Sequence, residues 1–169
     1  MSTKLTGSHS NKYQYSGFTI VEVVLVLSIS AMILLLVLWA IPNLQKSRRD
    51  TQRKSDLGRL ISQLESYASN TKGNYPTADA VGMTNASSFV PTYMTAAGET
   101  WKDPTGNAYT FDFTTSIGSV PSGSSGTIMY RTSAQCSASV AGTLSSTSSS
   151  KDIAAVMVLD KGYACRANK

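Results

Sequence analysis

Glu22 is the side chain best placed to do chemistry, because it is the one ionisable group in a long apolar run. The run extends from residue 18 to residue 41, and its other polar residues are Thr19, Ser28 and Ser30. A charge at the centre of a bilayer costs about 2.5–3.5 kcal/mol, so such a group usually has a functional partner. Two interpretations therefore stand: a carboxylate with such a partner, or a shallow residue of an ordinary anchor that reaches the lipid headgroups.

The two cysteines, Cys136 and Cys165, are the other residues with distinctive chemistry. In a compartment outside the cytoplasm they are predicted to form one disulfide, whereas the alternative is two buried free thiols. Spacing in the sequence does not decide between these, because the two Cα atoms must lie within about 7 Å of each other. A disulfide here would stabilise a small domain by about 2–4 kcal/mol.

The element that carries Glu22 is predicted to be a membrane-spanning helix. Its apolar run, residues 18–41, is longer than the roughly 20 residues that cross a bilayer. Pro42 follows directly. Because proline lacks an amide donor and crowds the preceding turn, we predict a helix kink at Pro42.

Residues 43–56 are almost wholly polar and are predicted to continue the helix. Asp50 and Lys54 stand at i, i+4, a spacing that favours an exposed helix. The basic residues here could bind phospholipid headgroups, DNA or an acidic neighbour, but a solvated helical face is the favoured interpretation. The formal net charge of +5 is too small to require a nucleic-acid partner. The basic residues are Lys46, Arg48, Arg49, Arg53 and Lys54, of which the last four form the cluster.

A stripe of apolar residues beginning at Leu57 predicts that the last part of the helix packs on a globular head. The spacing i, i+3, i+4, i+7 marks one buried helical face. Residues 70–73 are predicted to end the helix, with Gly or Asn in a left-handed cap. The stripe comprises Leu57, Leu60, Ile61, Leu64, Tyr67 and Ala68.

Four segments of the head have strand patterns: residues 108–113, 127–132, 153–159 and 162–166. Residues 153–159 are almost continuously apolar, which is typical of a central strand. The Ser-rich stretches 116–125 and 137–150 are predicted to be exposed loops. The fold class is therefore α+β: a long N-terminal transmembrane α-helix packed on a small antiparallel β-sheet.

The stretch Gly17-Phe18-Thr19-Ile20-Val21-Glu22, with the apolar run after it, resembles the class III signal of type IV pilins and type II secretion pseudopilins. The segments Gln52-Arg53-Lys54 and Gly73-Asn74-Tyr75-Pro76 also resemble the pseudopilin helix and its exit. The resemblance implies a pilin-like fold, cleavage after Gly17 by a membrane-embedded prepilin peptidase, and N-methylation of Phe18. It further implies assembly into a helical filament through Phe18 and Glu22.

The resemblance implies four regions along the chain. These are a leader (1–17), a transmembrane and filament-core helix (18–42), an extracytoplasmic amphipathic half of the same helix (43–72) and a β-sheet head (73–169). The leader is expected in the cytoplasm and the head outside it, although basic residues flank both ends of the span. The positive-inside rule alone would leave the head in the cytoplasm, but long domains translocate despite flanking charge.

The expected function is that of a structural subunit of a type IV pilus-like filament that serves adhesion, twitching motility or DNA uptake. Its expected partners are copies of itself or other pilins, the prepilin peptidase/methyltransferase, the membrane assembly platform and membrane lipid. DNA as a partner has no support in the sequence. The alternatives are a pseudopilin of a type II secretion-type system and a membrane-anchored binding protein that never assembles.

Catalysis is not expected of this chain. His9 is the only histidine and lies in the predicted leader, so the mature chain has no histidine for a triad or a zinc cluster. No Gly-x-Ser-x-Gly elbow or phosphate-binding loop is present. Asp103, Asn107 and Asp112 offer oxygen atoms but lack the spacing of a calcium site, so a plain β-turn is favoured there. We therefore expect no enzyme, no cofactor and no metal.

Overall fold

The computed structural model describes residues 17–85, 87–95 and 100–169, and the chain divides into two units, residues 1–41 and 42–169. The predicted leader, apart from Gly17, lies outside the described residues. The helix α1 (Ile20–Asn70) begins in the first unit and ends in the second, with Pro42 inside it. The kink predicted at Pro42 stays a prediction.

The described part of the first unit is an exposed apolar helix. Every residue from 17 to 39 is exposed, and the most apolar stretch of α1 has a mean hydropathy of 2.9 with no residue buried. Among the described residues, α1 is the one helix whose length and composition suit a membrane crossing. The predicted apolar helix is therefore confirmed, although it begins at Ile20 rather than at Phe18.

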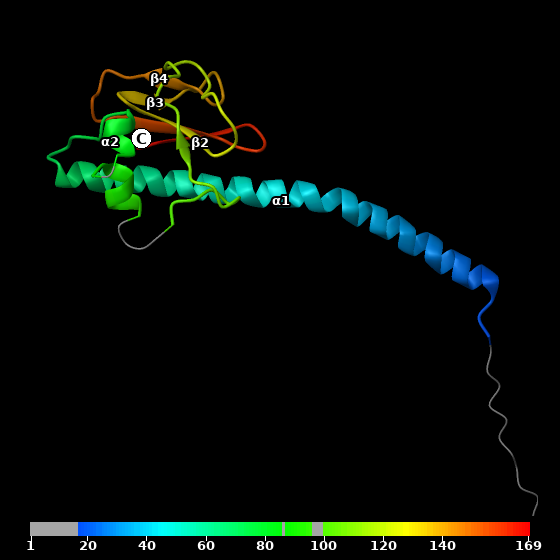
Figure 1. Ribbon diagram of the computed structural model, residues 1–169. Coiled ribbons are helices and arrows are strands. Elements are labelled where there is room, and N and C mark those ends of the chain that lie inside the picture. Colours follow the sequence, from blue (N-terminus) through cyan, green and yellow to red (C-terminus); the bar gives the residue numbers. More distant parts are fainter. Residues whose placement is uncertain (1–16, 86, 96–99) are drawn as a thin grey trace, which may run out of the picture. The chain divides into compact units, whose positions relative to one another are not determined.

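The second unit combines the C-terminal part of α1 with two sheets (Figure 1). The larger sheet has the order β1-β2-β5-β6, and the smaller one pairs β3 with β4. Two short helices, α2 (Ala80–Met83) and the π-helical turn η1 (Val90–Met94), follow α1. The strands are β1 (Thr110–Phe111), β2 (Thr127–Thr132), β3 (Ala134–Cys136), β4 (Leu144–Ser146), β5 (Ile153–Val158) and β6 (Tyr163–Ala167).

The central strand β5 separates two apolar cores. Alternate side chains of a strand point to opposite faces of its sheet. Ile153 and Ala155 therefore pack with Leu57 and other residues of the α1 stripe, while Ala154 and Val156 pack with residues of β3 and β4. Both faces of β5 are buried, which explains its nearly continuous apolar sequence and confirms it as a central strand, between β2 and β6.

Two predictions about the head are corrected by the structure. The larger sheet is mixed rather than antiparallel, because β1 runs parallel to β2 while β5 and β6 are antiparallel to their neighbours. The Ser-rich stretch 137–150 is not wholly an exposed loop, since it contains β4 and buries Thr143 and Leu144. Leu144 is the apolar residue that joins this stretch to the second core.

The end of α1 follows the prediction in part. The helix ends at Asn70, and the backbone amide of Gly73 donates to the carbonyl of Ala68 at 2.7 Å. Gly73 has the left-handed conformation expected of a C-terminal cap, with φ of 85°. Lys72, rather than Asn70, is the second left-handed residue, with φ of 59°.

Candidate functional site

The start of α1 holds Glu22 in the first helical turn. The hydroxyl oxygen of Thr19 accepts a hydrogen bond from the backbone amide of Glu22 at 3.2 Å, and the Thr19 carbonyl accepts one from Val23 at 3.3 Å. Thr19 is therefore the N-cap, and the spacing Thr-x-x-Glu is that of a capping box. A carboxylate in the first turn also lies near the positive end of the helix dipole.

Phe18 and Glu22, the residues expected to act in processing and assembly, line the same surface hollow. Its volume is about 270 Å³, and its other lining residues are Val23, Val26 and Leu27. Gly17 lies just before this hollow and is exposed. Among the described residues other than Gly17 and its chain neighbour Phe18, no atom lies within 4 Å of the position where a side chain at Gly17 would begin. A protein that approaches the bond after Gly17 therefore meets no obstacle in the described part of the chain.

A second cluster, here called the Arg53 cluster, consists of Arg49, Asp50, Arg53, Asp103 and Asp160. Arg53 is fully buried and binds the Asp103 carboxylate through two nitrogens, with Nη2 3.0 Å from Oδ2. Its Nη1 lies 2.9 Å from Asp160 and 3.2 Å from Asp50. Arg49 completes the cluster with a contact of 2.7 Å to Asp160. Two guanidinium groups thus bind three carboxylates.

The Arg53 cluster ties two distant loops to α1. Asp50 accepts hydrogen bonds from the backbone amides of Asp160 and Lys161, at 2.8 and 3.1 Å. Asp103 belongs to the loop after residue 99, and Asp160 follows β5. The cluster therefore fixes both loops against one turn of the helix, a contact between parts of the chain that are far apart in sequence.

The contacts of this cluster shift the pKa values of Asp160, Asp103 and Arg53. Burial by itself raises the pKa of Asp160, but hydrogen bonds from Arg49, Ser125 and Arg53 lower it to about 2. The pKa of Asp103 is also lowered, because the bonds from Arg53 and Thr105 outweigh the effect of burial. The pKa of Arg53 is raised, chiefly by its hydrogen bond to Asp103. All three groups are therefore charged at neutral pH.

The prediction of an exposed polar helix over residues 43–56 is wrong for the helical face that carries Asp50 and Arg53. Asp50 and Arg53 are buried, and Asp50 pairs with Arg53 rather than with Lys54. A signal was present in the sequence, because Asp50 and Arg53 lie seven and four residues before Leu57 and so continue the apolar stripe backward. The side chains of Lys46, Arg48 and Lys54 are exposed, as a solvated basic face requires.

The turn predicted after Asp103 is confirmed. The Asp103 amide donates to the carbonyl of Asn107 at 2.7 Å, and the Gly106 amide donates to the carbonyl of Asp103 at 2.8 Å. The Asp103 carboxylate binds Arg53, and that of Asp112 accepts bonds from Thr114 and other hydroxyl residues. In the described part of the chain, no group of three or more His, Cys, Asp or Glu residues is placed to hold a metal.

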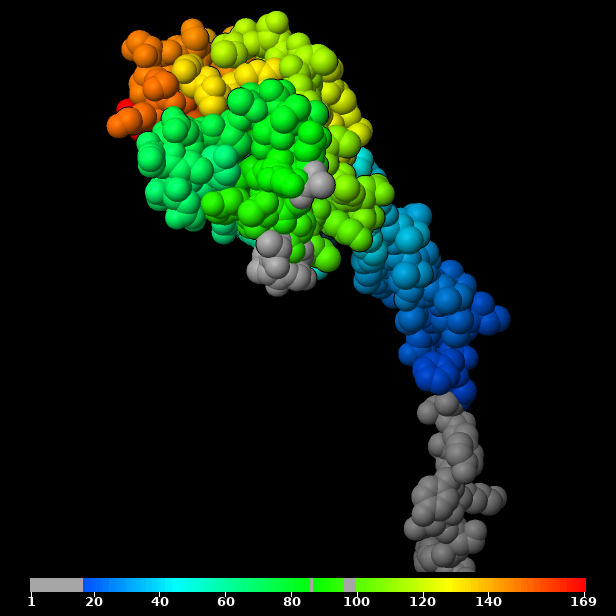
Figure 2. Space-filling model, turned by 60° about the vertical axis from the view of Figure 1, so that its left-hand side comes forward, coloured from blue at the N-terminus to red at the C-terminus, as the bar shows by residue number. Residues whose placement is uncertain are grey.

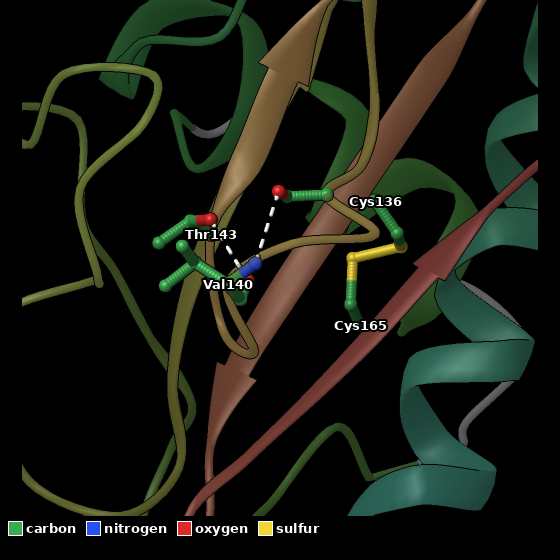
Figure 3. The surroundings of a disulfide bond; sticks show 5 residues. Cys136, Val140, Thr143 and Cys165 are labelled. Carbon is green, nitrogen blue, oxygen red and sulfur yellow. Dashed lines mark hydrogen bonds between the residues drawn. A yellow bond between two sulfur atoms is a disulfide. The ribbon is translucent and has the colours of Figure 1, made fainter.

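The predicted disulfide between Cys136 and Cys165 is confirmed, with Cα atoms 5.9 Å apart. It joins the end of β3 to the edge strand β6 and so fastens the smaller sheet to the larger one (Figure 3). The loop between β3 and β4 is closed by Thr143, whose hydroxyl donates to the carbonyl of Val140 at 2.9 Å. The bridge therefore secures the smaller sheet, which contributes only Ala134 and Leu144 to the second apolar core.

We expect the change of Cys136 to Ser to lower the free energy of unfolding by about 2–4 kcal/mol, because it frees a long loop of the unfolded chain. The double change of Cys136 and Cys165 to Ser should have the same effect as the single one, since one bond is lost in each. Denaturant titration of the full chain in micelles measures the effect, with Ser137→Ala as the control. Two freely alkylated thiols in the native protein would contradict the pairing.

Comparison of the chain with protein-family models, with curated proteins and with solved structures gave no match. The case for a function therefore depends on the residues and geometry described above. These comprise an exposed apolar helix that begins with Thr19 and Glu22, and a disulfide-bonded head joined to the same helix by buried charge.

Proposed function

We propose that the chain is a subunit of a type IV pilus-like filament, assembled through the apolar half of α1 after cleavage behind Gly17. The observation that carries this proposal is that every residue from 18 to 39 is exposed, in a stretch that opens with the sequence Gly-Phe-Thr-Ile-Val-Glu at residues 17–22. An apolar surface of this length is unstable in water and needs an apolar cover. In the proposed function, lipid covers it before assembly and other copies of the helix cover it afterwards.

The exposed apolar side chains of α1 are most stable when lipid or protein covers them along the whole apolar half of the helix. Burial of apolar surface contributes roughly 25 cal/mol per Å², and large side chains such as Leu25, Met32 and Leu35 are all more than half exposed. Inside a bilayer this gain is already present, so assembly exchanges lipid contacts for helix contacts. Packing and charge pairing between helices must then decide the register. Glu22 is the one residue of the described apolar half that supplies charge.

The head supports a location outside the cytoplasm, where disulfides form and persist. The Cys136–Cys165 bridge fits this compartment. In this orientation the leader stays in the cytoplasm, where a membrane-embedded prepilin peptidase reaches Gly17. The exposed basic residues Lys46 and Arg48 then lie on the outer side of the membrane, and the positive-inside preference is overridden by translocation of a long domain.

The processing step is tested by the intact mass of the native protein. We expect the mature chain to begin at Phe18 with a methylated amine, and we expect Gly17→Val to remain uncleaved. Glycine permits close approach of a peptidase to the backbone, and valine blocks it. Gly17 has open space around it, so the change introduces no clash within the described chain. Loss of cleavage in Gly17→Val would therefore mean that the peptidase no longer reaches the backbone at this site.

Ile20→Val is the matched control, because it alters a residue after the cut without adding bulk near the Gly17 carbonyl. It should be processed normally. A native chain that keeps residues 1–17, or normal cleavage of Gly17→Val, would rule out the proposed processing and favour the anchored binding protein. If cleavage occurs, electron microscopy with antibody to the head separates long surface filaments from the short filaments expected of a pseudopilin.

A further inference from the structure

A pocket on the head, remote in sequence from Glu22, is formed by the end of α1, the segment after it, α2 and the residues that lead into η1. Its volume is about 330 Å³. These segments lie together on the surface (the teal and green parts of Figure 2). The pocket lies wholly within the second unit. Ligand pockets in proteins begin at about 300 Å³, so this one has room for a single small ring.

Aromatic rings form one wall of the pocket and are held in place by the core. Phe89 is buried and stacks on Tyr93, with ring centres 5.6 Å apart. Tyr67 meets both rings edge to face, at 5.9 and 5.2 Å. Tyr67 and Tyr93 are half-buried, so part of each ring remains open to a ligand. A preformed aromatic wall loses little conformational entropy when a ligand binds.

The polar groups of the pocket are hydroxyls. Among the described residues that line it, none has an ionisable carboxylate, amine or guanidinium group. The hydroxyl oxygen of Tyr93 accepts a hydrogen bond from the Asn70 amide at 3.3 Å, which leaves its own proton free to donate to a ligand. The hydroxyl residues of the lining are Tyr67, Tyr75, Thr77, Ser87, Ser88, Thr92 and Tyr93. Two of them already donate within the chain, Thr77 to the Asp79 carboxylate and Ser88 to the Asn85 carbonyl.

Tyr75 remains a neutral donor at physiological pH. Burial and the nearby charge of Glu65 raise the pKa of its phenol above the ordinary value. The acidic neighbour also disfavours an anionic ligand, since like charges repel. The wall beneath is tightly packed, because a side chain added at Gly82 would begin 2.3 Å from the Thr77 hydroxyl. The pocket is therefore rigid, uncharged and rich in hydroxyl groups.

We propose that this pocket binds a neutral pyranose sugar. A pyranose has an apolar C–H face that can lie against the Tyr67 and Tyr93 rings, and a rim of hydroxyl groups that can pair with those of the pocket. Its size matches the cavity, and its lack of charge matches the lining. The inference goes beyond filament assembly, because the pocket uses residues of the head and needs no second copy of the chain.

The test uses the full chain in lipid nanodiscs, which avoids detergents with sugar headgroups. Saturation-transfer NMR would be recorded with the methyl glycosides of glucose, galactose, mannose and N-acetylglucosamine. We expect at least one to receive saturation through its C–H face. Tyr93→Phe and Thr92→Val keep the shape of the pocket and remove one hydroxyl each. Each change should weaken binding about fivefold, the usual effect of one hydrogen bond.

Tyr163→Phe is the matched control, because Tyr163 lies on β6 outside the pocket and is partly exposed. It should leave binding unchanged. The proposal is overturned if none of the four neutral glycosides binds, or if binding ignores both hydroxyl changes. It is also overturned if methyl glucuronide, which carries a carboxylate, binds more tightly than the neutral sugars. The measurement does not involve assembly, so its failure would leave the proposed filament function intact.

Discussion

Replacing Arg53 with methionine will lower the free energy of unfolding of the head by about 3–5 kcal/mol, the usual cost of removing one partner from a buried ion pair. Methionine keeps much of the side-chain volume, so the main loss is the charge. Arg53 is fully buried and contacts three carboxylates, and its removal leaves Arg49 alone among them. The loop that carries Asp103 then loses this attachment to α1, while the loop after β5 keeps its contacts with Arg49 and Asp50.

Fluorescence of Trp101 reports this change, because the side chain is buried and packs against Tyr109 with ring centres 4.7 Å apart. Denaturant titrations of the full chain in micelles would use a Trp39→Phe background so that Trp101 is the only tryptophan, excited selectively over the tyrosines. Lys54→Met is the matched control. Lys54 is the exposed basic neighbour of Arg53, so its change should shift stability by less than about 0.5 kcal/mol.

Stability measured at acid pH distinguishes two causes of the destabilisation in Arg53→Met, the loss of charge pairing and the loss of packing. Asp103 and Asp160 have lowered pKa values in the folded protein, so their contribution to stability is complete above their unfolded pKa of about 3.9. It is lost as the pH falls through the folded value, about 2 for Asp160. The stability of the wild-type head should therefore fall between about pH 4 and pH 2.

The Arg53→Met variant should respond less to acid over the same range. Its carboxylates lack the guanidinium that lowers their pKa, so their protonation relieves repulsion instead of breaking a pair. The difference between the two proteins should therefore shrink below pH 4. A difference that stays constant from pH 7 to pH 3 would show that Arg53 acts through packing alone.

The Arg53 cluster also shows which contacts could not be predicted from the sequence. The apolar stripe from Leu57 predicted the buried face of α1, and its backward continuation passes through Arg53 and Asp50. Periodicity indicates which residues face inward, but it does not say which partners they meet. Asp103 lies 50 residues from Arg53, and such pairings are set by the fold as a whole.

The two sheets also have features that local sequence patterns did not predict. The segments 127–132 and 153–159 were predicted from local patterns, and β2 and β5 match them closely. The direction of β1 relative to β2 was not predictable in this way. It depends on how the connection between Phe111 and Thr127 turns, and this connection contains no regular element. The strand β4 is three residues long, too short to give an alternating pattern.

Glu22→Leu should insert and be cleaved normally but reduce filament yield about tenfold or more, a loss of 1.4 kcal/mol or more per subunit contact. In the proposed function, cleavage after Gly17 creates a positive amine on Phe18, at the end of the helix where the dipole is also positive. Thr19 holds Glu22 one turn away, in the hollow that Phe18 lines. The carboxylate can therefore balance that amine on its own chain or on a neighbouring one.

In an apolar filament core this attraction is far stronger than in water, although desolvation offsets much of the gain. The pair should therefore set the register of neighbouring helices more than it adds strength. Ser28→Leu is the matched control, because Ser28 donates its hydroxyl to the Val24 carbonyl of its own helix and supplies no charge. Filament yield is compared at equal membrane levels of mature subunit. If Glu22→Leu assembles as well as the wild type, Glu22 is a shallow carboxylate of an anchor, since removing a charge from the membrane costs nothing by itself.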